Sequence, residues 1–262
     1  MECDSCGGPK LKEHAAAVSK IPEPFVLTSA DYMTLHFTVR GTQSQMDTRR
    51  PDALDLEYTR MMMGFLLFRP AASRILMLGL GGGSLAKFCH RHLPAVDITV
   101  VEINPQVIAL REQFRVPPDG PRFRVVEADG ADFVRACRTR YDVLLADAYD
   151  LGGLPRRLAS RRHYADCAAV LAPAGLLVAN LHLDSADHAP RVARLRSVFG
   201  AHSLVVEDPE EGHGIAFASR APLRAPACPG WAGFAAVAGG QECAAVEASL
   251  SRVRSAHAEW RA

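Results

Sequence analysis

The fold is decided by residues 74–102, which read RILMLGLGGGSLAKFCHRHLPAVDITVVE. A short apolar run predicts a buried strand, a glycine-rich turn leads into a helical pattern, and a second apolar run ends in Glu102. The glycines of the turn are Gly79, Gly81, Gly82 and Gly83. They let the backbone turn sharply and approach a ligand without Cβ atoms in the way. An acid about 20 residues beyond such a turn is placed to bind the two hydroxyls of a ribose.

Further apolar runs alternate with helical patterns along the middle of the chain. Short strands rich in branched residues that alternate with helices predict a parallel sheet covered on both faces. Two last strands, joined by an acidic turn, predict an antiparallel hairpin at one edge. The expected fold is therefore α/β, a Rossmann-like doubly wound domain with a mostly parallel seven-stranded sheet. The expected strands are 75–78, 98–101, 123–126, 143–146, 176–180, 203–207 and 214–218, and the expected helices are 84–92, 105–114, 131–137, 161–171 and 190–199.

Four parts are expected along the chain. Residues 1–23 form a flexible leader, and residues 24–50 form a small β-hairpin unit. Residues 51–220 form the Rossmann-like nucleoside-binding catalytic domain, which starts with a helix over 52–68, and residues 221–262 form a C-terminal helical extension. The β unit has alternating Leu35, Phe37 and Val39 on one side, and the extension has an amphipathic helix over 241–260 that makes a packing or oligomer contact.

Composition narrows the class of protein. The formal net charge is +1, so the chain lacks the basic excess that is typical of nucleic-acid-binding proteins. No apolar run is long enough to span a membrane. Seven scattered cysteines favour a reducing cytoplasm over a disulfide framework. Cys3 and Cys6 form a C-x-x-C without a second pair at zinc spacing, so no metal site is expected.

Acids follow two further strands. Asp129 and Gly130 come after the third strand, where a carboxylate can accept from an adenine amine. The glycine turn, Glu102 and this pair stand in order at successive strand ends, and together they predict a site for an adenosine-containing molecule. The spacing G-x-G-G-G-S differs from the G-x-G-x-x-G of pyrophosphate binders.

The fourth strand ends in ADAYDLGG, which places Asp147 and Asp150 at the carboxyl edge of the sheet. Two carboxylates there suit a cationic amine, and one could accept the amine's proton and free a lone pair for attack. The electrophile would be a carbon bonded to a sulfonium. The plain alternative is that one carboxylate caps a helix and the other is solvated.

Together these elements resemble the spermidine synthase (polyamine aminopropyltransferase) family, a branch of the S-adenosylmethionine-dependent methyltransferase fold. The shared motifs are Gln43-Ser44, Tyr58 to Met61, Gly81 to Gly83, Glu102-Ile103-Asn104, Asp129-Gly130 and Asp147 to Asp150. The resemblance implies that Glu102 binds the ribose, Asp129 the adenine, and Asp147 the amine as base. It also implies that Gln43 and Tyr58 line the donor and amine pocket, and that Ile103 and Ser84 belong to the donor site.

Two departures from the family pattern bear on the substrate. The glycine loop usually continues with an aspartate that holds the donor's amino group, and here Ser84 stands there. Without a replacement, losing that anion weakens a charge-assisted hydrogen bond by about 1.5–3 kcal/mol. The family's tyrosine before the last strand is also absent, since the turn has the sequence DPEEG. The β unit looks shorter than the family's, which leaves a homodimer through it open.

Three functions remain open at this stage. The first is aminopropyl transfer from decarboxylated S-adenosylmethionine to a small-molecule amine. The second is transfer of a methyl or aminocarboxypropyl group from intact S-adenosylmethionine, which Ser84 supports because a less acidic loop tolerates the donor's carboxylate better. The third is a non-catalytic nucleoside-binding protein, against which both Asp147 and Asp150 speak.

Overall fold

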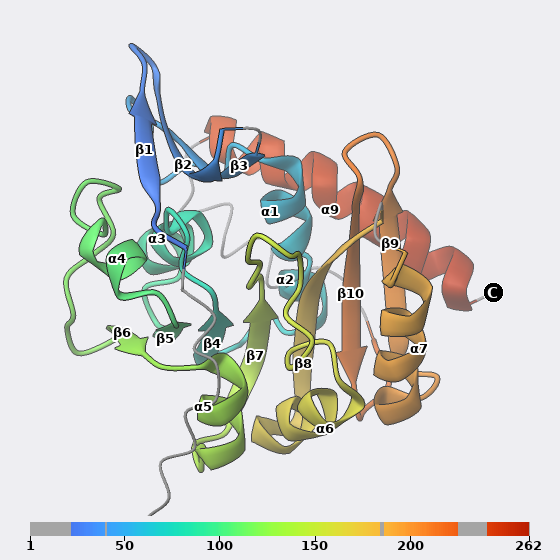
Figure 1. Ribbon diagram of the computed structural model, residues 1–262. Helices are drawn as coiled ribbons and strands as arrows, with labels where there is room; N and C mark the ends of the chain where they lie inside the picture. The colour runs from blue at the N-terminus through green and yellow to red at the C-terminus, as the bar shows by residue number, and fades with distance from the viewer. Residues whose placement is uncertain (1–21, 40, 184–185, 225–239, 262) are drawn as a thin grey trace, which may run out of the picture.

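The structure is a computed structural model that describes residues 22–39, 41–183, 186–224 and 240–261. Its centre is a seven-stranded sheet in the order β6-β5-β4-β7-β8-β10-β9 (Figure 1). The strands are β4 (Arg74–Leu78), β5 (Asp97–Glu102), β6 (Phe123–Glu127), β7 (Tyr141–Ala146), β8 (Leu171–His182), β9 (Ser203–Asp208) and β10 (His213–Ser219). β4 to β8 pair in parallel, whereas β10 is antiparallel to both neighbours. The predicted doubly wound sheet with its terminal hairpin is confirmed.

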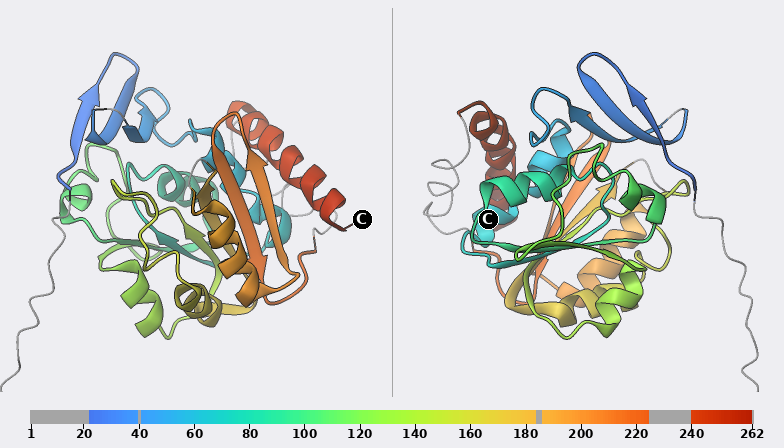
Figure 2. Two further views of the ribbon diagram at one scale, coloured as in Figure 1. Left: turned by 45° about the vertical axis from the view of Figure 1, so that its right-hand side comes forward. Right: turned by 90° about the vertical axis from the view of Figure 1, so that its left-hand side faces the viewer.

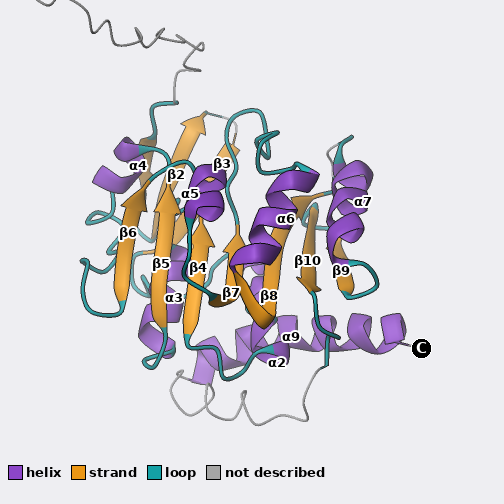
Figure 3. Ribbon diagram, turned by 90° about the horizontal axis from the view of Figure 1, so that it is seen from below, coloured by secondary structure: helices purple, strands orange, loops and turns teal. Residues whose placement is uncertain are grey.

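Helices cover both faces of this sheet because its central strands are apolar on both sides. One face carries α1 (Glu57–Met62), α2 (Phe65–Phe68), α3 (Ser84–His92), α4 (Pro105–Ala109) and α9 (Gly240–Arg261). The other carries α5 (Gly130–Ala136), α6 (Arg161–Val170) and α7 (His188–Phe199). Along β4, for example, Ile75 and Met77 join the first core and Leu76 and Leu78 the second. Figure 3 shows α5, α6 and α7 in front of the sheet and α9 behind it.

The N-terminal β unit has one strand more than predicted. β1 (Phe25–Thr28), β2 (Tyr32–Thr38) and β3 (Gly41–Asp47) form an antiparallel sheet that Figure 2 shows standing beyond the central sheet. Leu35 is buried as expected, but Val39 is 88% exposed. The expectation for Val39 was wrong because the pairing shifts at a bulge after Leu35 and β2 ends at Thr38.

Two predicted helices are shorter than expected. The helix over 52–68 is broken into α1 and α2 at Gly64, where a Cβ would lie 2.7 Å from a ring carbon of Phe217. The amides of Met63 and Gly64 reach back three residues, which tightens the chain into a turn. The helix over 105–114 ends at Ala109, where the amides of Leu110 and Arg111 bond only three residues back and the chain leaves the helix in a turn.

The C-terminal helix α9 packs against α1 and β9, and Val246, Leu250 and Val253 are buried as the pattern predicts. No helix within the described ranges combines the length and the apolar character that a membrane crossing needs. Most of the expected leader, with Cys3 and Cys6, lies outside the residues that the structure describes.

Candidate active site

The glycine turn after β4 lies directly against the end of β7. Gly79 has a φ of +93°, and a Cβ on it would lie 2.2 Å from the carbonyl oxygen of Asp147. A Cβ on Gly82 would lie 2.6 Å from Ser44 Oγ of the small N-terminal sheet. Gly83 also has a positive φ, at 71°. Only glycine meets these demands, so the turn is a point of close approach between three segments.

Glu102 at the end of β5 holds this turn. Its Oε2 accepts a hydrogen bond of 2.8 Å from the amide of Leu80, and its Oε1 accepts one of 2.9 Å from the amide of Asn104. A carboxylate offers about four lone-pair sites, so each oxygen keeps one for a further donor. Ile103, which stands between Glu102 and Asn104 in the chain, is 50% exposed. The carboxylate is therefore fixed in place and still able to accept two hydroxyl groups.

Asp129 begins α5 and is already engaged on both oxygens. Its Oδ1 accepts from the amides of Ala131 and Asp132, which makes it the helix N-cap. Its Oδ2 pairs with Arg157 at 2.7 Å, and the same guanidinium reaches Asp132 at 2.6 Å. Any ligand amine at Asp129 must share this carboxylate with Arg157, a contact that the sequence did not reveal.

Asp147 follows β7 and has a hydrogen-bond donor on each oxygen. The Tyr58 hydroxyl donates to Oδ2 at 3.1 Å, and the Asn180 amide donates to Oδ1 at 2.9 Å. Burial raises the pKa of the Asp147 carboxyl, while the bonds from Asn180 and Tyr58 act against that rise. Burial and the negative charge of Asp147 together raise the pKa of Tyr58 well above its usual value. Asp147 is thus a desolvated carboxylate with fixed geometry, as a general base requires.

Aromatic and imidazole rings surround this carboxylate. His213 of β10 stacks on Tyr58 with ring centres 4.6 Å apart. Tyr149 stacks on His182 at 4.0 Å, and its hydroxyl donates to the carbonyl of Asn180. These side chains form rigid walls beside Asp147, and they come from four separate segments of the chain.

Asp150 has a different setting from Asp147. Asp150 is exposed, and its Oδ1 accepts a hydrogen bond of 2.7 Å from the amide of Gly152. Backbone bonds between Asp150 and Gly153 close the same tight turn. The structure therefore gives Asp150 a local capping contact, and a role in binding an amine stays a prediction.

The region around Ser84 contains a carboxylate that the motif lacks. Ser84 Oγ lies 3.5 Å from the backbone carbonyl of Gln45, whose side-chain amide donates to Asp55. Gln43, two residues earlier on β3, is half-buried. Ser84 and Asp55 therefore both contact Gln45, Ser84 at its backbone and Asp55 at its side chain. The sequence pattern gave no signal for Asp55.

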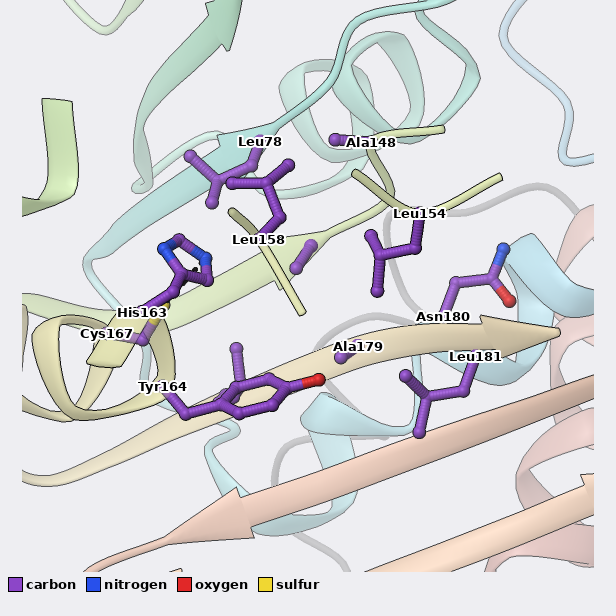
Figure 4. A pocket seen from close by; sticks show the side chains of 12 residues that line it. Leu78, Ala148, Leu154, Leu158, His163, Tyr164, Cys167, Ala179, Asn180 and Leu181 are labelled. Carbon is purple, nitrogen blue, oxygen red and sulfur yellow. Dashed lines mark hydrogen bonds between the residues drawn. The ribbon is translucent and has the colours of Figure 1, made fainter. Parts of the chain in front are cut away.

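A hollow lies on the face of the sheet that α6 covers, and Leu154 and Leu158 of the loop before α6 line it (Figure 4). Leu78 lines it as well, and Leu78 and Leu158 are also the side chains nearest to a Cβ placed on Gly130. His163 and Tyr164 of α6 point toward it, and neither His163 Nδ1 nor the Tyr164 hydroxyl has a hydrogen-bond partner within the described part of the chain. The hollow is mainly apolar and adjoins the start of α5.

Parallel pairing brings three predicted acids to one edge of the sheet. Glu102, Asp129 and Asp147 follow the neighbouring strands β5, β6 and β7 around β4. Asn180 is an additional site residue that the sequence analysis missed, although a polar residue near the end of an apolar strand was a usable signal. In the described ranges, no three His, Cys, Asp or Glu side chains are grouped as a metal site would need.

A family profile and curated sequence relatives at 37–38% identity point to the same family. A family profile described as "Spermine/spermidine synthase domain" matches residues 55–185. The polyamine aminopropyltransferase of Chromobacterium violaceum is 38% identical over 199 residues, which cover 76% of each chain.

Solved structures share the fold. A probable spermidine synthase from Corynebacterium glutamicum matches with a TM-score of 0.68 at 23% identity, over 83% of this chain and 84% of that one. Human methyltransferase-like protein 13, solved in complex with SAH, matches with a TM-score of 0.60 at 26% identity, over 75% of this chain and 93% of that one.

Proposed function

Because the chain belongs to the spermine/spermidine synthase family, we propose that it is a transferase that moves the aminopropyl group of decarboxylated S-adenosylmethionine to an amine. The released product is methylthioadenosine. The observation that carries this proposal is Asp147, a half-buried carboxylate held by Tyr58 and Asn180 next to the glycine turn. It supplies a base where an amine would meet a bound sulfonium.

The nucleoside is bound by the glycine turn and the strand-end acids. Glu102 accepts the two ribose hydroxyls on the lone pairs that Leu80 and Asn104 leave free. The adenine ring lies near Gly130 at the apolar side chains of Leu78 and Leu158, and its amine shares Asp129 with Arg157. Ile103 and Gln43 complete the donor site in this proposal.

The reaction needs a neutral amine. Asp147 accepts a proton from the substrate's ammonium group, and the freed lone pair attacks the aminopropyl carbon bonded to the sulfonium. A carbon–nitrogen bond forms, the carbon–sulfur bond breaks, and its electron pair neutralises the sulfur to a thioether. The new secondary ammonium keeps its charge, and the proton that Asp147 accepted passes to solvent before the next turnover. A desolvated base whose pKa is raised toward that of the amine lowers the cost of the first transfer.

Methyl transfer from intact S-adenosylmethionine is a second candidate, favoured by Ser84 and by the likeness to human methyltransferase-like protein 13. An uncharged Ser84 would tolerate the donor's carboxylate. The family match argues the other way, because the curated relatives at 37–38% identity are polyamine aminopropyltransferases.

One experiment separates the two candidates. The protein is incubated with each sulfonium donor together with putrescine, spermidine or a simple monoamine, and the nucleoside product is identified by mass spectrometry. Methylthioadenosine formed from the decarboxylated donor supports the proposal. Formation of adenosylhomocysteine from the intact donor, without methylthioadenosine, would overturn it in favour of methyl transfer.

We also propose a cytoplasmic homodimer that forms through the small N-terminal sheet. Leu27 and Tyr32 on this sheet are 55% and 40% exposed. The described cysteines, Cys89, Cys137, Cys167 and Cys243, are free thiols, as a reducing compartment permits. Light scattering after size-exclusion chromatography tests the dimer, and Leu27→Asp should convert it to a monomer.

A further inference from the structure

The Asn180 amide is held from two sides. Its nitrogen donates to Asp147 Oδ1 at 2.9 Å, and its oxygen lies 3.1 Å from His213 Nδ1. A deprotonated carboxylate only accepts hydrogen bonds, so the NH₂ group of Asn180 must face Asp147. An amide oxygen also only accepts, and therefore His213 Nδ1 must carry a hydrogen. The state of one imidazole thus sets the orientation of the amide on the base.

His213 also contacts the second donor to Asp147. Its ring lies against the ring of Tyr58 with centres 4.6 Å apart and planes 22° from parallel, and the Tyr58 hydroxyl donates to Asp147 Oδ2. His213 therefore touches both side chains that hold the carboxylate, one through a hydrogen bond and one through its face. Asp147, Asn180, His213 and Tyr58 thus form a closed ring of contacts, in which each residue touches the next.

We propose that His213 is a positioning residue for the reaction: through Asn180 and Tyr58 it fixes the Asp147 carboxylate in the orientation that takes the proton from the amine. Its catalytic consequence rests on the proposed function, whereas its effect on Asp147 does not. His213 lies outside residues 55–185, which carry the family match.

The C-terminal helix α9 is linked to His213 through the neighbouring strand β9. His213 is the register partner of Asp208, and the buried Asp208 carboxylate forms an ion pair with Arg252 of α9. Ser249 of the same helix donates to Glu57, the residue before Tyr58, at 2.8 Å. α9 therefore braces both segments that flank Asp147, the β10 segment with His213 and the α1 segment with Tyr58.

The measured quantity is the pKa of Asp147, read by carbon NMR of the labelled carboxyl group and assigned with Asp147→Asn. The titratable groups around it are Tyr58 from α1, Tyr149 after β7, His182 from β8 and His213 from β10. His213→Phe keeps a ring against Tyr58 but cannot donate to Asn180, so Asn180 loses its fixed orientation and the pKa should rise. His213→Gln can still donate from its amide and should stay near the wild-type value.

His202→Phe is the matched control, since this ring meets the Arg220 carbonyl away from the site. Nitrogen NMR of the wild type should show His213 protonated at Nδ1. An unchanged Asp147 pKa in His213→Phe, an equal rise in His213→Gln, or a proton on Nε2 alone would each overturn the proposal. None of these readouts needs turnover, so a wild type that transfers no aminopropyl group refutes the proposed function without deciding the role of His213.

Kinetics then test the catalytic consequence. In His213→Phe we expect kcat to fall about 10-fold, the scale of one lost buried hydrogen bond, with the KM for the sulfonium donor unchanged. The acidic limb of the kcat/KM profile should move to higher pH, and His213→Gln should restore most of the rate. A change in donor KM with kcat and profile preserved would contradict a positioning role.

Discussion

The ionised Asp147 carboxylate destabilises the folded protein, because the folded structure withdraws it from water. Burial raises the pKa of its carboxyl above the ordinary 3.8, so the folded protein binds this proton more tightly than the unfolded chain. The free energy of unfolding must therefore fall as the pH rises from 3.8 through the folded-state pKa. The uncharged Asp147→Asn variant avoids this loss, because Tyr58 can turn its hydroxyl to accept.

We expect Asp147→Asn to unfold at a higher temperature than the wild type near pH 8, by roughly 2–4 °C for each kcal/mol gained. The gain should shrink as the pH falls toward 3.8, because the wild-type carboxyl becomes protonated on the way. Calorimetry across this pH range measures it. A variant that melts below the wild type near pH 8 would speak against a desolvated carboxylate.

Glu102 governs nucleoside affinity rather than the chemical step. Glu102→Gln keeps the size of the side chain but removes the charge that accepts from the Leu80 amide and the ribose. We expect methylthioadenosine to bind about 10- to 100-fold more weakly by calorimetry, the scale of charge-assisted hydrogen bonds. Asp147→Asn is the control and should leave this affinity nearly unchanged. Equal affinities for Glu102→Gln and the wild type would remove Glu102 from the ribose site.

The glycine turn between β4 and α3 links fold and site. A Cβ on Gly79 would overlap the Asp147 carbonyl, at a φ of +93° that favours glycine. We expect Gly79→Ala to lose about 2 kcal/mol or more of stability, along with activity, because two backbones must move apart. Gly120→Ala is the matched control, since nothing lies within 4 Å of its Cβ. Urea unfolding compares them, and equal midpoints would show that the close approach is not real.

The contact between α9 and β9 depends on a buried charge. Removing Arg252 leaves the Asp208 carboxylate without its ion-pair partner. We expect Arg252→Gln to destabilise the protein by about 1–3 kcal/mol, and the double variant Arg252→Gln with Asp208→Asn to recover part of that loss. Urea unfolding of the set measures the coupling, and strictly additive losses would show that the pair does not interact.

Elements with a strong local pattern were predictable from the sequence. The helix over 84–92 and the parallel strands matched because the glycine and apolar signals agreed there. The break at Gly64 was not, since it depends on Phe217, a residue more than 150 positions away. Local patterns carry no record of such contacts.

For the whole molecule, the order of strand-end acids predicted the site, because parallel strands bring their carboxyl ends to one edge. Glu102, Asp129 and Asp147 lie there as expected. The antiparallel return of β10 delivers His213 to the same edge, and α9 braces it. The sequence predicted the hairpin and a packing helix over 241–260, but it gave no sign that either contributes to the site, since that depends on how distant segments pack.

A structure determined with methylthioadenosine and an amine tests the account most directly. The ribose hydroxyls should lie on Glu102, the adenine beside Gly130, and the amine nitrogen within hydrogen-bond distance of Asp147 on the side of the nucleoside's sulfur. A nucleoside bound away from the glycine turn, or an amine separated from Asp147 by packed side chains, would contradict the account.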